Sequence, residues 1–127
     1  MQKVLNVLVA LIGLFCAAQW LLWSFAYAQI SHAWAVSAID AVGANNLRGD
    51  IGGMFLATGA FCALYFRYGV VWLKAAAIVM ASVALGRAVG FVMGDFAVKA
   101  VLSLIVECVF VAVFLAAAGE GVSAHRE

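Results

Sequence analysis

Four long apolar runs, separated by short polar segments, make up most of the chain, and they cover residues 4–28, 47–68, 69–94 and 96–118. Roughly 20 helical residues, each rising about 1.5 Å, cross the hydrocarbon of a bilayer, so every run is long enough to span it. The pattern therefore predicts an all-α integral membrane protein with a single domain, built as an up-down four-helix bundle.

The segment between the first two runs, residues 29–46, is more polar than either run. Ile30, Trp34 and Ala38 recur in it at helical spacing, and polar residues interrupt the apolar pattern. We expect a short helix lying at the membrane interface, followed by a turn that ends the segment. After the fourth run, residues 119–127 are expected to form a short polar tail.

The first run also has features of a secretory signal peptide. Lys3 precedes it, and residues 26–28 match the small-x-small cleavage pattern. The run is longer than the apolar part of such a peptide, however, and it carries Trp20 and Trp23 close to the cleavage pattern. We therefore expect it to remain as a membrane helix.

Composition supports the same class of protein. Apolar residues make up 69% of the chain, against roughly 45–50% in soluble domains. A soluble domain of this length is too small to bury that many apolar side chains, because its surface is large relative to its volume. In a bilayer the same side chains can face lipid. The net charge is +1 and no basic stripe is present, so we expect the bilayer as partner and no nucleic acid.

Positively charged residues set the expected orientation. With four spans, both termini lie on the same side of the membrane. The positive residues of that side are Lys3, Arg67, Lys74 and Arg126, against Arg48 and Lys99 on the other side. Because cytoplasmic loops carry the excess of Lys and Arg, we expect both termini in the cytoplasm.

Four charged residues, Arg48, Asp50, Arg87 and Glu107, are expected to lie inside the membrane, all in the half of the bundle away from the termini. A charge at the bilayer centre costs at least about 2.5–3.5 kcal/mol, so each should face the bundle and have a partner. Residues two apart on a helix do not face each other. We therefore expect Asp50 to pair with Arg87, or Arg48 with Glu107.

Two interpretations of this cluster stay open. It is either an interhelical ion-pair network that fixes helix order, or the lining of a pocket that binds a small or lipidic ligand. In the pocket, the arginines would hold a carboxylate or phosphate, and Gln19, Asn45 and Asn46 would contribute polar contacts. If the site belonged to an acid–base enzyme, Glu107 or Asp50 would transfer the proton.

Two further functions stay open. Small multidrug exporters are similar in size and span number and use one membrane glutamate for proton coupling, but they carry it in the first helix, where this chain has no acid. The other is a structural or accessory subunit. Small residues suit such a role, since Gly86, Gly90 and Gly94 recur every four residues, and Gly52 and Gly53 open the second run. We expect these glycines to pack within the bundle, with a homodimer interface as the alternative.

No residue set suggests a metal or another cofactor. His32 and His125 lack metal-ligand spacing. Cys16, Cys62 and Cys108 are dispersed in apolar runs without a Cys-x-x-Cys motif, so we expect packed free thiols.

The segment Asn46–Gly53 (NLRGDIGG), followed by Gly86-Arg87 and then by Glu107, resembles a small bacterial membrane family known as domain of unknown function 4345. The likeness covers nearly the whole chain. It implies bacterial origin, hence the cytoplasmic membrane, and four spans. It implies no reaction, and it assigns no catalytic residue.

Overall fold

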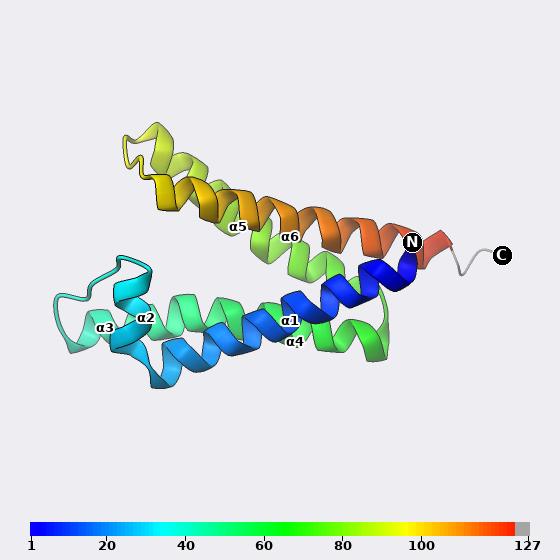
Figure 1. Ribbon diagram of the computed structural model, residues 1–127, viewed down its shortest axis with the longest axis horizontal. Coiled ribbons are helices and arrows are strands. Elements are labelled where there is room, and N and C mark those ends of the chain that lie inside the picture. Colours follow the sequence, from blue (N-terminus) through cyan, green and yellow to red (C-terminus); the bar gives the residue numbers. More distant parts are fainter. Residues whose placement is uncertain (124–127) are drawn as a thin grey trace.

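The computed structural model describes residues 1–123, and all its regular elements are helices. Figure 1 shows the long helices α1, α4, α5 and α6 and the short elements α2, α3 and η1, which connect α1 to α4. In chain order the bounds are α1 Gln2–Phe25, α2 Tyr27–Ala33, α3 Ala41–Leu47, η1 Arg48–Gly52, α4 Gly53–Tyr68, α5 Val71–Val92 and α6 Val98–Ser123.

Four helices are long and apolar enough to cross a membrane, as the apolar runs predict: Gln2–Phe25, Ala41–Tyr68, Val71–Val92 and Val98–Glu120. Large apolar side chains such as Leu14, Ile78 and Leu102 stay exposed along these helices. So much exposed apolar surface is unfavourable in water and ordinary in lipid. The chain is therefore an all-α protein with the helices of a multi-pass membrane protein.

Two boundaries differ from those expected. The turn predicted before the second span is wrong, because α3 begins at Ala41 and continues through the π-turn η1 into α4. Asp40 starts this helix early, since its carboxylate accepts a hydrogen bond from the Gly43 N–H at 2.8 Å. The tail expected from residue 119 is helical as far as Ser123. His125 and Arg126 lie outside the described residues.

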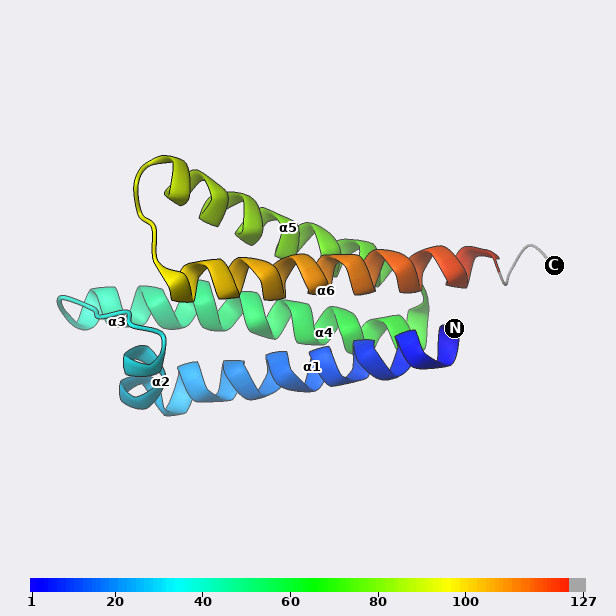
Figure 2. The same ribbon diagram turned by 45° about the horizontal axis from the view of Figure 1, so that its top comes forward.

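The long helices form two antiparallel pairs, α1 with α4 and α5 with α6 (Figure 1). The pairs meet at the end that carries the N-terminus and the turn after Tyr68, and they diverge towards α2 and α3. In Figure 2, the far end of α5 likewise stands away from α4 and α1. Contacts between α4 and α5 and between α1 and α6 join the two pairs.

Close packing of α1 on α4 depends on Gly13 and Gly59. A Cβ atom on Gly13 would lie 2.9 Å from the Cβ of Cys62, and one on Gly59 would lie 3.3 Å from the Gly13 carbonyl oxygen. Cys16 and Cys62 are buried free thiols in this contact. Small side chains thus let the two helix backbones approach, as in other membrane helix pairs.

The glycines expected to form packing faces lie mostly in open positions. Gly53 and Gly86 have no atom within 4 Å of an added Cβ, and Gly90 meets only Asp95, at 4.0 Å. Gly94 lies beyond α5 with φ at 101°, a conformation that suits a residue ending a helix. Of this set only Gly52 approaches another helix, with Trp23 3.4 Å from an added Cβ. The expected packing of Gly53, Gly86 and Gly94 within the bundle is therefore wrong.

A hydrogen-bonded triad closes the end where the helix pairs meet. The Tyr65 hydroxyl donates to the Asn6 side-chain oxygen at 2.7 Å, and the Gln2 side-chain amide donates to both, at 2.9 and 3.0 Å. In a low-dielectric surrounding such bonds are strong. They hold the start of α1 against the end of α4.

We predict that Gly13→Ala destabilises the protein, because the new methyl group overlaps Cys62, and overpacking typically costs about 1–3 kcal/mol. The matched control is Gly86→Ala, which adds the same methyl group in open space and should be neutral or slightly stabilising. Thermal unfolding in detergent, followed by circular dichroism, measures both. Equal melting temperatures for the two variants would contradict the assignment of Gly13 to the close contact.

Candidate functional site

Helical spacing brings polar residues of α5 and α6 to the inside of the bundle. On α6, Lys99, Ser103 and Glu107 follow each other at intervals of four residues and share one face. On α5, Val83 and Arg87 are likewise four apart, and both line the same internal cavity. On each helix, the face that lines the cavity thus carries a charged residue near the end where the two helix pairs diverge.

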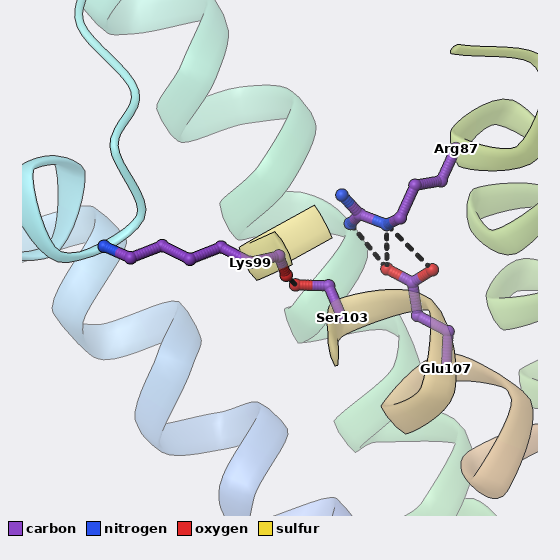
Figure 3. A network of polar contacts seen from close by, with 4 residues as sticks. All are labelled: Arg87, Lys99, Ser103 and Glu107. Carbon is purple, nitrogen blue, oxygen red and sulfur yellow. Dashed lines mark hydrogen bonds and ion pairs between the residues drawn. The ribbon is translucent and has the colours of Figure 1, made fainter. Parts of the chain in front are cut away.

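Arg87 and Glu107 form an ion pair between α5 and α6 (Figure 3). The Arg87 Nη2 donates to Glu107 Oε1 at 2.6 Å, and the Nε donates to Oε1 and Oε2 at 3.2 Å. The Glu107 side chain is 11% exposed and the Arg87 side chain 25%. This fork-like contact is the strong form of a charge-assisted hydrogen bond, and it neutralises both charges away from water.

The direction of the side chains explains why these two residues meet. Arg87 lies five residues before the end of α5, and Glu107 lies nine residues after the start of α6. Their backbones therefore differ in level by about 6 Å. Side chains on a helix lean towards its N-terminus, so in this antiparallel pair Arg87 and Glu107 lean towards each other.

Aromatic rings from four parts of the chain line the same cavity as this pair. Phe15 of α1 contacts Phe55 of α4 and Phe110 of α6 edge-to-face, with centroids 6.2 and 5.9 Å apart. Trp34, which follows α2, contacts Phe55 in the same way at 5.6 Å. Edge-to-face packing holds such rings in defined positions. The four rings form an aromatic wall that crosses the bundle.

The aromatic wall and the ion pair line one cavity of about 550 Å³, which also borders on Lys99, Ser103 and residues 34–36. Its volume falls in the range of roughly 300–1,000 Å³ that is usual for small-molecule sites. Most of its lining is apolar, and its charged residues are Arg87, Lys99 and Glu107. This combination of apolar walls and a few polar groups is typical of ligand pockets.

Neither of the two pairings expected for Arg48 and Asp50 forms. Both residues are exposed on η1. The Arg48 guanidinium lies over the Tyr27 ring, 4.9 Å from its centroid. The Asp50 carboxylate makes no hydrogen bond or ion pair with the described part of the chain. The two charges near the start of the second span are thus not part of the site that Arg87 and Glu107 form.

The amide residues expected at the site also lie elsewhere. Asn45 and Asn46 are exposed on α3. Gln19 of α1 is half-buried, and its side-chain oxygen is buried without a hydrogen-bond partner. None of these three residues lines the cavity.

Sequence reasoning missed Lys99, Ser103 and the aromatic wall as parts of the site. For the two polar residues a signal was present, because both precede Glu107 by multiples of four on one helix. For Trp34 and Phe55 no such signal exists, since their meeting depends on how the segment after α2 folds back on α4. Residues 1–123 contain no group of three His, Cys, Asp or Glu side chains placed to hold a metal ion.

The comparisons with known proteins give no family. The chain matches no protein-family model, no curated protein and no solved structure. The geometry of the cavity therefore carries the functional argument.

We predict strong coupling between Arg87 and Glu107 in a double-mutant cycle. Arg87→Met leaves the Glu107 carboxylate unpaired, and breaking a buried pair typically costs about 3–5 kcal/mol of unfolding free energy. Glu107→Gln should cost less, because a glutamine oxygen still accepts from the guanidinium. The variant carrying both changes should lose less unfolding free energy than the two single variants lose together.

Unfolding by sodium dodecyl sulfate in mixed micelles measures the cycle. Arg48→Met serves as control, since its guanidinium is exposed and lies only over a ring. Losses that simply add would show that the two side chains do not interact in the folded protein.

Proposed function

We propose that this protein binds a small or lipidic ligand within the membrane, in the cavity that borders on Arg87 and Glu107. The observation that carries the proposal is the position of the ion pair on the wall of an aromatic-lined cavity. A pair that served only to hold α5 on α6 needs no cavity beside it, because close packing around a neutralised pair is more stable than a void.

The pair also keeps hydrogen-bonding capacity for a ligand. Arg87 uses its Nε and Nη2 towards Glu107, and in Figure 3 its other terminal nitrogen points away from the carboxylate. A guanidinium has five N–H donors, so donors remain for a carboxylate, phosphate or carbonyl oxygen. Acid–base chemistry with Glu107 as the proton-transfer group is a special case of this proposal.

The proposal places the chain in the bacterial cytoplasmic membrane as an up-down bundle with both termini in the cytoplasm. Support comes from the larger number of Lys and Arg residues on the side of the termini. The resemblance to the bacterial membrane family is consistent with it. In this orientation α2 and the segment that follows it lie at the outer interface, and the cavity opens into the outer half of the membrane. The exposed Gly86 and the half-buried Gly90 leave α5 available for a second copy of the chain.

We predict that filling the cavity abolishes binding of apolar probes. Ala100 lines the cavity. The substitution Ala100→Phe should therefore lower the affinity for hexadecanol and for hexadecanoate by about tenfold or more. Tenfold corresponds to about 1.4 kcal/mol of binding free energy. Ala112→Phe makes the same change at an exposed position of α6 and serves as control. Native mass spectrometry of the purified full chain in detergent measures bound probe. Wild-type affinity in Ala100→Phe would place the binding site elsewhere.

We predict opposite labelling of two loops in intact cells. Ile39→Cys, in the exposed segment before α3, should react with a membrane-impermeant maleimide added outside. Tyr68→Cys, which is also exposed and lies at the other end of the bundle, should react only after the cells are opened. The unchanged chain provides the background from its own cysteines. The reverse pattern would invert the proposed orientation.

A further inference from the structure

A second hollow lies beside the aromatic-lined cavity. It is open, has a volume of about 710 Å³, and is lined by α2, by residues 35–38 and by Lys99. Its polar groups include the hydroxyls of Ser31 and Ser37 and the imidazole of His32. We call it the polar hollow. It differs from the cavity in being wider open and richer in hydrogen-bonding side chains.

The polar hollow and the cavity share a border. Ala35, Val36 and Lys99 line both of them. In Figure 3, the Lys99 side chain extends away from the Arg87–Glu107 pair and towards α2, so its ammonium group points to the polar side of this border. A molecule lying across the border would have one end among hydroxyls and a charge and the other among aromatic rings.

The backbone at this border is held in place by the end of α2. The Val36 N–H donates to the Ser31 carbonyl at 2.9 Å, and the Ala35 N–H donates to the His32 carbonyl at 3.1 Å. These two bonds form a Schellman motif, which requires the residue after the cap to adopt a left-handed conformation. Ala35 has φ at 55° and fills that position, although glycine usually does. The backbone at the border between the two hollows therefore has a fixed conformation.

The charges beside the two hollows do not cancel. Arg87 and Glu107 neutralise each other, whereas Lys99 forms no ion pair with any residue from 1 to 123. The shared border therefore carries one uncompensated positive charge. A lysine near the end of a membrane helix directs its ammonium group to the headgroup level, where anionic groups bind it.

We infer that the ligand is an anionic amphiphile, with its carboxylate or phosphate on the Lys99 ammonium in the polar hollow and its apolar chain in the cavity. This inference rests on the proposed function, because it assigns the two ends of a ligand to two hollows of one site. The hydroxyl of Ser37 supplies a further donor to the headgroup. The chain passes Ala35 and Val36 and lies along the aromatic wall.

The test compares two probes that differ only in their headgroup, hexadecanoate and hexadecanol, on the full chain in an uncharged detergent at pH 8. In the wild-type protein hexadecanoate should bind about tenfold or more tightly than hexadecanol, since a charge-assisted hydrogen bond is stronger than a neutral one. Lys99→Gln should remove this preference, because its loss of affinity should be about tenfold or more greater for hexadecanoate than for hexadecanol. Lys74→Gln is the matched control, because this exposed lysine on α5 lines neither hollow.

Two further variants and one competitor separate the possible results. Lys99→Arg keeps the charge and should keep the preference. Acetate, which has the carboxylate without the chain, should not displace hexadecanoate at equal concentration. Displacement by acetate would identify a plain anion site and overturn the inference.

Equal affinity of the wild-type protein for both probes overturns the inference about the headgroup, and so does an equal loss for both in Lys99→Gln. Either result leaves the proposed function intact as long as Ala100→Phe weakens binding. If neither probe binds the wild-type protein, the proposed function itself fails. The failures of the two proposals are thus distinguishable in one set of measurements.

Discussion

The ion pair of Arg87 and Glu107 is the interaction on which the inner arrangement of this protein depends. Two charges of opposite sign can remain at this depth only if each neutralises the other, because the cost of an isolated charge in hydrocarbon is several kcal/mol. This requirement fixes the rotation of α5 and α6 about their axes. Once the two helices are set in this way, Val83 on α5 and Ser103 on α6 also turn inwards, and the interior face of the pair is defined.

The aromatic wall provides the other side of the same interior. Phe15, Phe55, Phe110 and Trp34 are large and rigid, and their edge-to-face contacts keep the α1–α4 pair from collapsing onto the α5–α6 pair. The space that remains is lined mostly by apolar side chains and carries charged groups at a few positions. A cavity with this contrast in polarity orients any molecule that enters it, because the two ends of the molecule have different solvation costs.

The sequence predicted the four membrane-crossing helices well, because crossing depends on the length and apolarity of a run and on little else. It also identified Arg87 and Glu107 as buried ionisable residues, yet it assigned them other partners. Which charges meet depends on the rotation of each helix, and the π-turn η1 changes the direction of Arg48 and Asp50 relative to the rest of α4 in a way that no regular helical spacing anticipates. Lys99 was used only to orient the chain in the membrane, since its place at the site depends on the approach of residues 34–36 to the same cavity. Gly13 was missed because its contact with Cys62 joins two helices far apart in sequence.

The triad of Gln2, Asn6 and Tyr65 joins α1 to α4 at the end where the two helix pairs meet, whereas the pairs lie apart at the other end (Figure 1). The two helix pairs are closest at the end that carries the N-terminus, and the angle between them is set there. The 26 residues of α6 extend about 39 Å from that end. A change of a few degrees in the angle at that end would move the far end of α6 by a few ångströms. This distance is comparable to the width of an acyl chain. The width of the cavity therefore depends strongly on the angle between the two helix pairs.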